Sequence, residues 1–454
     1  MLHIRAYLNT YTHAATLAFF RLAFGLMMFF GIVRFMSYGW IDKFYIKPVF
    51  HFTYYGFSWV KPYGVFTYAA FIVCGLSALM VAVGYKYRLS IILFFLTFTY
   101  TELLDKTTYL NHYYFVSVIS FAMIFLPANA YFSADAYKNP NKAFTQIPRW
   151  TTDILKLLLA IVYFYAGLAK LNTDWLINAM PLKIWLPGNA DLPVIGPLLT
   201  KQWVAYTFSY AGAVYDLGIV FLLLYKRTRW LGFALVVIFH ILTKILFPIG
   251  IFPYVMIVAS LLFFSAGFHI KVLGYIAQLL KLPFNPSAEA RIKVAANTPL
   301  YNFKIAFLAA FILLQLAFPF RYLFYPQELF WAEEGFRFSW RVMLMEKAGY
   351  AEFMVSDPVT GKGLTVDNSK FLTPFQEKQM SFQPDFILEY AHFLHDHYQA
   401  QGMHDPEVRV SSYVALNGRL STLYIDPNVN LAKQDESFLH KTWILPFRDT
   451  IKGF

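Results

Sequence analysis

Polar and ionisable side chains occur inside or at the ends of long apolar runs in this chain. They are Glu102, Asp105, Lys106, Asn111, His112, Lys170, His240 and Lys244. A charged side chain at the centre of a membrane span costs roughly 2.5–3.5 kcal/mol on insertion scales, so such groups are retained where they pair, line a cavity or move protons. Lysine and histidine are residue types that can exchange a proton with a ligand. These residues are therefore the candidates for a functional site.

The predicted depths of these residues bring them to one side of the membrane. Lys170 ends one predicted helix, Asn111 and His112 begin another, and His240 lies in the outer half of a third. These helices run in opposite directions, yet the polar groups fall on the side that also carries the C-terminal region. We therefore predict a site where the outer ends of these helices meet.

Each candidate also has a structural interpretation. Lys170, at a helix C-terminus, can extend to the interface and complement the helix dipole. His112 can be a hydrogen-bonded interfacial histidine, and His240 a buried neutral one. Lys106 and Lys244 are interpreted as snorkelling or paired rather than chemical. Depth alone leaves these alternatives open.

Two further groups have structural interpretations only. Asp216 lies at a depth similar to that of Arg21, and we predict that the two pair. The histidines of the HFLHDH segment are interpreted as a solvated helix face, because no Cys and no second ligand cluster accompanies them. They are His392, His395 and His397. No metal site is predicted, and the chain has no GxSxG, P-loop, HExxH or CxxC motif.

The composition indicates a membrane protein. Of the 454 residues, 58% are hydrophobic and 14% are charged, whereas soluble domains have roughly 25% charged residues. The net charge of +12 fits the Lys and Arg excess of cytoplasmic loops, and no nucleic-acid partner is predicted. Runs of about 20 apolar residues predict an α-helical integral membrane bundle of about nine helices. Their ranges are 14–35, 64–84, 89–104, 110–132, 152–169, 203–225, 230–247, 249–266 and 305–324.

The loops predict the orientation and the domains. Lys and Arg residues concentrate in the short loops on the side of the membrane that holds the N-terminus. This bias places the N-terminus in the cytoplasm. Residues 1–325 are predicted to form the transmembrane domain, and residues 326–454 a small extracytoplasmic β-rich domain. A bacterial inner membrane is preferred to an endoplasmic reticulum membrane, because the chain contains no Asn-x-Ser/Thr sequon with x other than Pro.

Turn signals organise the C-terminal region. Asp357-Pro358 and Gly361 separate two strand-like stretches, and Asn417-Gly418 separates two more. Asn-Gly between such stretches is the strongest short signal for a hairpin. A helix is predicted near 384–400, and the segment 268–283 is predicted to be an amphipathic helix on the cytoplasmic interface.

Several segments, in order along the chain, resemble the vitamin K-dependent γ-glutamyl carboxylase family. The stretch YFYAGLAKLNTDWL (163–176) resembles a tyrosine-rich segment of that family with a lysine and a D-W ending. Three other parts match the family in the same order, and together the matches cover nearly the whole chain. They are LDKTTYLNHYYF with PANAYFSAD (104–135), VIFHILTKILFPIGIFPYVM (237–256), and GFRFSWRVMLM with LNGRLSTLYIDPNV (335–345 and 416–429).

The resemblance implies a membrane enzyme that carboxylates peptide glutamate. In the family's reaction a reduced vitamin K or related quinol is oxidised by O2 to the epoxide, and CO2 is added to the glutamate γ-carbon. The implied ligands are therefore a quinol, O2, CO2 and a Glu-containing peptide or protein, besides the lipid membrane.

The resemblance also assigns roles to residues. Lys170 is the implied base, a role that suits lysine because desolvation makes its neutral amine available. His112 and Asn111 match residues near the quinone, and His240 is implied to line the same pocket. Arg419 matches an arginine that holds the glutamate carboxylate, which suits its fork geometry. Further substrate or quinone contacts are implied for Tyr163, Tyr165 and Trp340.

Two positions depart from the family pattern. Met345 stands where animal members have a histidine, and Lys347 stands where they have an arginine. Because those positions are associated with the glutamyl substrate, a quinol oxygenase that lacks carboxylation is an alternative function. A non-catalytic, partner-binding membrane protein is a second alternative.

Overall fold

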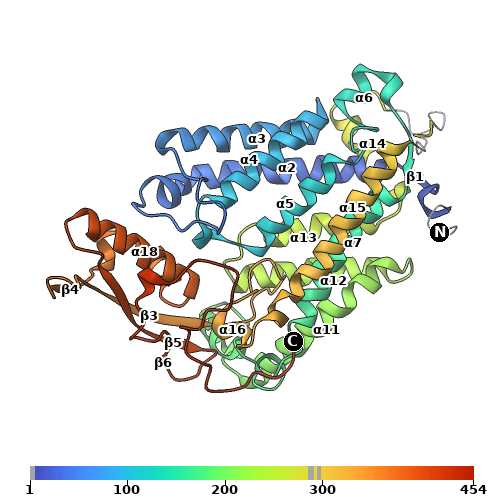
Figure 1. The fold of residues 1–454 in the computed structure, drawn as a ribbon. Helices are drawn as coiled ribbons and strands as arrows, with labels where there is room; N and C mark the ends of the chain where they lie inside the picture. Colours follow the sequence, from blue (N-terminus) through green and yellow to red (C-terminus); the bar gives the residue numbers. More distant parts are fainter. Residues whose placement is uncertain (1–5, 285–290, 294–297) are drawn as a thin grey trace.

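The structure of the chain is a computed structural model, and it describes residues 6–284, 291–293 and 298–454. Long helices and a smaller sheet region lie side by side (Figure 1). Among the described residues, six helical stretches are long and apolar enough to cross a membrane, as in a multi-pass membrane protein. They are α2 (Ala15–Ser37), η2 with α3 (Gly64–Val83), α7 (Trp150–Leu168), α11 (Gln202–Leu224), α12 (Arg229–Leu246) and α15 with η7 (Pro299–Phe324).

The predicted count of nine spanning helices is not confirmed. The other predicted runs form α4 (Tyr87–Leu103), α5 (Asn111–Ile124) and α13 (Phe252–Ser260), which are short. At 1.5 Å per residue α5 is about 21 Å long, less than the roughly 30 Å of hydrocarbon that a span must cross. Pro127 follows closely after α5 and prevents its continuation. Between α13 and α14 (Ala266–Leu279) the chain bends by 119°, so this pair adds at most a seventh, broken span.

Close backbone contacts hold the N-terminal helices together. Helix α2 packs against α3, and a Cβ at Gly25 would lie only 2.5 Å from the backbone nitrogen of Ala82. One turn earlier in α2, the buried Arg21 donates hydrogen bonds to the backbone oxygens of Ala82 and Phe132, at 3.3 and 2.6 Å. Backbone carbonyls therefore hold this guanidinium group, and the predicted pair of Arg21 with Asp216 is wrong.

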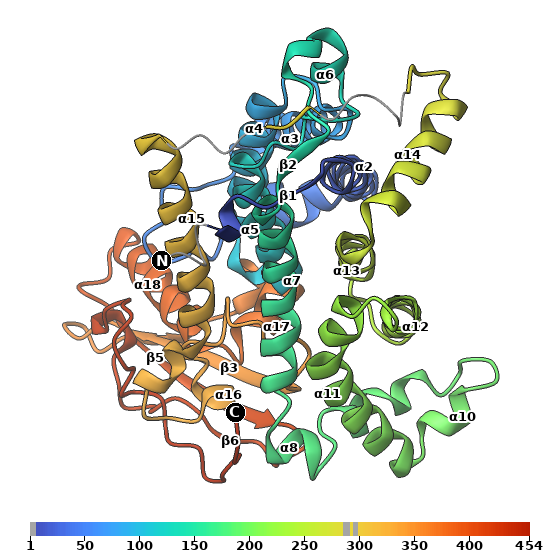
Figure 2. The ribbon, with the colours of Figure 1, turned by 90° about the vertical axis from the view of Figure 1, so that its right-hand side faces the viewer.

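Helices α11, α12 and α13 pack beside α7 and form another part of the bundle. Figure 2 shows α11, α12 and α13 stacked beside α7, in agreement with their direct contacts. Helix α14 covers most of the predicted amphipathic segment 268–283 and packs on α2 through the buried Leu273. The short elements are β1 (Tyr11–His13), β2 (Gln146–Pro148), α6 (Ala134–Lys138), α8 (Thr173–Leu176), α9 (Leu182–Trp185), α10 (Gly196–Leu199) and α16 (Leu329–Ala332).

The C-terminal region contains an antiparallel sheet with helices against it. The strand order is β4-β3-β5-β6, and every neighbouring pair is antiparallel. Helix α18 packs against β3 and β5, where the rings of Phe353 and Tyr390 lie 5.0 Å apart. The elements are β3 (Lys347–Ser356), β4 (Gly363–Thr365), α17 (Pro374–Met380), α18 (Pro384–Ala400), β5 (Glu407–Leu416) and β6 (Thr422–Leu423).

Both predicted turns in this region connect paired strands. Ser356 pairs with Gly363 across the first turn, and Val414 pairs with Thr422 across the second. Asn417 has a φ of 49°, a conformation that Asn tolerates better than most residues. The predicted hairpins and the predicted helix at 384–400 are confirmed.

The core of the C-terminal region continues into the helical region. The Phe52 ring stacks on Phe386 with a centroid distance of 4.8 Å, and Trp175 and Leu246 belong to the same buried cluster. This shared core fixes the position of the sheet relative to the ends of α7 and α12. The division into domains 1–325 and 326–454 stays a prediction.

Candidate active site

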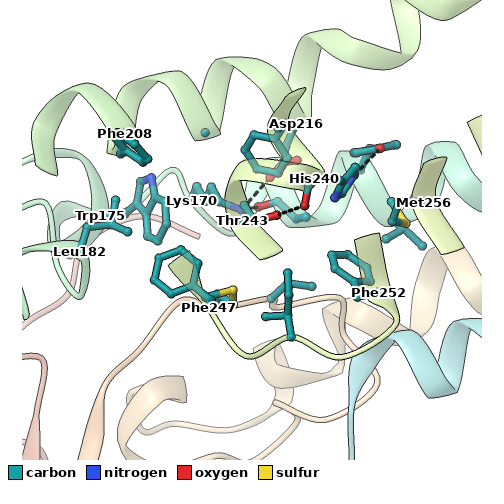
Figure 3. A pocket seen from close by; sticks show the side chains of 18 of the residues that line it. Lys170, Trp175, Leu182, Phe208, Asp216, His240, Thr243, Phe247, Phe252 and Met256 are labelled. Atoms are coloured by element: carbon teal, nitrogen blue, oxygen red, sulfur yellow. Dashed lines mark hydrogen bonds and ion pairs between the residues drawn. The ribbon is translucent and has the colours of Figure 1, made fainter. Parts of the chain in front are cut away.

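A largely apolar cavity lies between α7, α11, α12 and α13 (Figure 3), and residues 342 and 343 also line it. The unoccupied space in and at the mouth of this cavity is about 740 Å³, a volume that includes space open to the surroundings. Its walls are mainly aromatic and aliphatic, and its polar side chains come from α7 and the residues just after it, from α11 and from α12. These polar side chains are Tyr163, Lys170, Asp216, His240 and Thr243.

Lys170 and Asp216 form a buried ion pair in the cavity wall. The Lys170 Nζ donates to Asp216 Oδ2 at 2.6 Å and to the Ala166 carbonyl oxygen at 3.1 Å. The two residues are only 6% and 5% exposed. The Lys170 ammonium also lies 5.2 Å from the centre of the Trp175 ring, a cation–π distance. The amine is thus fixed in position at the edge of an apolar space (Figure 3).

The local structure explains why these two residues meet. Helix α7 ends at Leu168, so Lys170 follows its last turn, whereas Asp216 lies roughly four turns into α11. The two helices pack closely at Gly167, where a Cβ would lie 2.7 Å from Leu217 Cγ. The sequence prediction placed Asp216 at the depth of Arg21, away from the outer helix end that carries Lys170, and it therefore missed Asp216 as the partner of Lys170. The sequence did contain a signal for this pair, because an acidic and a basic residue lie on neighbouring apolar runs.

Tyr163 and His240 form a second polar contact in the same cavity. The Tyr163 hydroxyl lies 3.1 Å from His240 Nε2 and 3.3 Å from the Tyr215 hydroxyl. Among the described residues, His240 Nδ1 has no hydrogen-bond partner. The structure therefore brings together three of the predicted site residues, Lys170, His240 and Tyr163.

His112 lies next to this cavity but is not part of its lining. Its ring centre is 5.6 Å from that of Phe252, and the His240 ring centre is 5.5 Å from the same phenylalanine. The amide of the neighbouring Asn111 donates to the backbone oxygen of Arg341 at 3.2 Å. The structure thus connects Asn111 to the segment that carries residues 342 and 343, rather than to the cavity itself.

Four other predicted candidates lie elsewhere. Tyr165 donates to the backbone oxygen of Leu316, and Trp340 stacks on Tyr114 at 4.8 Å. Glu102 lines a separate cavity between α2 and α4. The Lys244 ammonium, exposed on α12, hydrogen-bonds to Tyr254.

Arg419 is occupied by carboxylates of its own chain. It makes a bidentate contact with Asp174 at 2.7 and 2.8 Å and bonds Asp449 at 2.8 Å. The hydrogen bond to Asp174 is the main reason that the pKa of Arg419 is raised. Lys347 is similarly engaged, because its Nζ bonds the Trp331 carbonyl oxygen at 2.6 Å and Glu333 at 2.9 Å.

The histidines of α18 have separate partners. His392 contacts the Gln434 carbonyl oxygen and His395 contacts the Pro406 carbonyl oxygen, each at 2.8 Å. His397 contacts the side chain of Gln401 at the same distance.

A multi-pass helical bundle with a lysine–aspartate pair beside an apolar cavity defines a membrane protein with an internal polar site. Two family profiles match the chain. The HTTM domain matches residues 9–268, and the vitamin K-dependent gamma-carboxylase lumenal domain matches residues 300–450. The chain belongs to the gamma-carboxylase family. No solved structure matches it.

The two matched domains divide the candidate residues. Lys170, Asp216 and His240 lie in the HTTM part, and Lys347 and Arg419 lie in the lumenal-domain part. The family implies vitamin K hydroquinone as the redox ligand. The aromatic walls suit a flat quinone ring, and the Lys170 amine supplies a polar group within reach of that space.

Proposed function

We propose that this protein is a vitamin K-dependent γ-glutamyl carboxylase-type enzyme, and that its reduced quinone binds in the cavity beside Lys170. The observation that carries this proposal is an amine buried in an aromatic cavity within the HTTM domain of a gamma-carboxylase family member. The bound quinol would supply the reaction with O2 that makes proton removal from glutamate possible. The protein would supply the proton acceptor, the orientation of the ring and the exclusion of water.

The residues that line the cavity support the proposed roles of the protein in orienting the ring and excluding water. Trp175, Phe208, Phe239, Phe247 and Phe252 provide aromatic surface on several sides of the cavity. Such surfaces hold a planar ring by area burial and stacking. The same apolar surroundings keep water away from the ion pair, which strengthens every electrostatic interaction in the site.

The test uses the purified full-length protein in nanodiscs. Vitamin K hydroquinone, O2, labelled bicarbonate and a Glu-rich peptide are supplied, and quinone epoxide and incorporated label are measured together. The wild type should form both, and Lys170→Ala should lower both by roughly 10²–10⁴-fold, the usual contribution of a general base. Lys244→Ala is the matched control, since it removes a lysine that is exposed on α12. Neither product from folded wild-type protein would contradict the proposal and favour a non-catalytic role.

A second candidate function is quinol oxygenation without carboxylation. The observation that favours it is that Arg419 and Lys347 are both engaged by carboxylates of the chain itself. Neither cation is free to hold a glutamate carboxylate unless these contacts break. In the same assay this function predicts quinone epoxide without label in the peptide.

We also propose that the C-terminal region lies on the extracytoplasmic side and the N-terminus in the cytoplasm. The match to a lumenal domain at residues 300–450 supports this orientation. In a Cys74→Ser background, Val359→Cys in the exposed β3–β4 turn should react with an impermeant thiol reagent added outside intact cells. Arg227→Cys, in the exposed α11–α12 loop, should react only after lysis. The opposite pattern would reverse the orientation.

A further inference from the structure

The proposed role of Lys170 as a base requires that its nitrogen can accept a proton. The 2.6 Å distance from Lys170 Nζ to Asp216 Oδ2 is as short as that of a charge-assisted hydrogen bond between an ammonium group and a carboxylate. An ammonium nitrogen has no lone pair and cannot accept a proton. Lys170 therefore becomes a base only when one of its own protons leaves.

The contacts of Lys170 show where that proton can go. Among the residues that the structure describes, its Nζ bonds the carboxylate of Asp216 and the carbonyl oxygen of Ala166. A peptide carbonyl is far too weak a base to take a proton from an ammonium group, whereas a carboxylate in an apolar site can become a neutral acid. The other titratable groups of the cavity are Tyr163 and His240, and these two contact each other.

We propose that Asp216 receives the proton displaced from Lys170, so that the pair, rather than the lysine alone, is the proton acceptor of the site. Asp216 acts through Lys170 and is in this sense a positioning and proton-storing residue. The inference rests on the proposed function, because the ligand whose hydroxyl proton is taken up is the reduced quinone.

The step balances without any other reactant. An N–H bond of Lys170 breaks, and its proton forms an O–H bond at Asp216 Oδ2. The O–H bond of the ligand hydroxyl then breaks, with its electron pair staying on the ligand oxygen, and the proton forms a new N–H bond at Lys170 Nζ. No electron is transferred, the net charge of the cavity does not change, and no proton enters the surrounding water.

The test follows the carboxyl group of Asp216 without turnover. Vitamin K hydroquinone is added under anaerobic conditions to full-length protein in nanodiscs, and an infrared difference spectrum is recorded. Proton release into a weakly buffered medium and the amount of bound ligand are measured on the same sample. The wild type should show a new carboxylic-acid C=O band that shifts in ²H₂O, with no proton released.

Variants assign the band. Asp216→Asn should bind the ligand and lack the band, and Asp216→Glu should show it at a shifted position. Asp153→Asn is the matched control, because Asp153 lies in the first turn of α7 and forms ion pairs with Arg149 and Lys156 away from the cavity. It should keep the band unchanged.

Each other result contradicts a specific claim. Ligand binding without the band and with about one proton released per bound ligand would overturn the role of Asp216 and leave the quinol site intact. A band already present before ligand is added would overturn the charged resting pair. Absence of ligand binding in the folded wild type would overturn the proposed function itself.

Discussion

Two buried lysines, Lys106 and Lys170, have very different surroundings. The Lys106 ammonium lies 3.1 Å from Asp385 and 2.8 Å from Glu389, and its side chain is 2% exposed. Within the part of the chain that the structure describes, Lys170 has one carboxylate partner, Asp216, and open apolar space beside it. A lysine surrounded by fixed carboxylates has no room for a ligand, whereas Lys170 has both a proton partner and a cavity. The Lys106 ion pairs are therefore interpreted as structural, whereas the Lys170–Asp216 ion pair is a candidate for proton transfer.

The Lys106 cluster connects the helical region to the sheet region. Lys106 lies between α4 and α5, and its two nearest carboxylates lie on α18. The carboxylate of Glu389 also accepts hydrogen bonds from the backbone and hydroxyl of Thr53, each at 2.7 Å. Burial by itself would lower the pKa of Lys106, but Asp385 and Glu389 raise it above its usual value. Of the two structural interpretations of Lys106, snorkelling or pairing, these contacts support pairing.

The largest expected effect on stability comes from Lys106→Met. Removing one partner of a buried ion pair leaves uncompensated charge and costs about 3–5 kcal/mol. Lys170→Met should cost less, because it uncovers one carboxylate that can take up a proton. Denaturant unfolding in detergent or nanodiscs measures both free energies. Equal losses in the two variants would show that the contrast between the lysines does not exist.

The pH dependence of the Lys106 cluster sharpens the same contrast. Lys106 and Arg337 hold the pKa of Asp385 well below its usual 3.8, despite the opposing effect of burial. Because the folded pKa is lower than the unfolded one, this stabilisation is present above about pH 4 and is lost as pH falls further. The raised pKa of Lys106 means that its contribution persists up to its unfolded value of 10.5 and is lost as pH rises through the folded pKa.

We therefore expect the difference in unfolding free energy between wild type and Lys106→Met to stay constant between about pH 5 and pH 9 and to shrink below pH 4. Denaturant titrations at several pH values measure this difference. A difference that grows in acid would contradict the assigned directions.

Arg419→Gln should lower the free energy of unfolding by roughly 1.5–3 kcal/mol, because it removes charge-assisted hydrogen bonds to the buried Asp174. The expected change is in stability, with the KM for a Glu-containing peptide unaltered. A higher KM at unchanged stability would instead support the substrate-holding role implied by resemblance and would favour carboxylation.

The smallest effects are expected for the same substitution at two glycines, Gly167→Ala and Gly212→Ala. Gly167→Ala would place a methyl group 2.7 Å from Leu217 Cγ and 2.9 Å from its backbone nitrogen, so overpacking of about 1–3 kcal/mol is expected. Gly212→Ala meets only ordinary contacts, at 3.6 Å from Trp175 and 3.9 Å from Lys170. It should change stability by less than about 0.5 kcal/mol. Thermal unfolding of the two variants compares them directly, and a large cost at Gly212 would contradict the open space beside Lys170.

Some of the candidate site was predictable from local sequence. Lys170 and His240 were identified because ionisable groups in apolar runs are costly, and the structure places both at one cavity. The hairpins and helix α18 followed from turn residues and periodicity, which act over a few neighbouring residues. Helix lengths were predicted less well, since hydropathy alone does not show where α5 and α13 end.

Pairing between distant residues was not predictable in the same way. Asp216 was assigned to Arg21, whereas the structure pairs it with Lys170 at 2.6 Å. Depth along each helix is a property of sequence, but rotation about the helix axis and the relative height of two helices are set by packing. The structure also adds a contact between Arg419 and Asp174 that the sequence did not indicate, and the substrate-holding role that the resemblance implies for Arg419 stays a prediction.

The sequence by itself determined that this is a multi-pass helical membrane protein with a β-containing C-terminal region, because composition and local periodicity decide these features. It also determined that a lysine and a histidine lie at unfavourable depths in apolar runs. Only the tertiary structure decided that Lys170 contacts Asp216 in the wall of an aromatic cavity while Lys106 is enclosed by carboxylates of α18. The physical reason is that an ionisable group acquires its role from the charges and the space around it, and distant segments supply both.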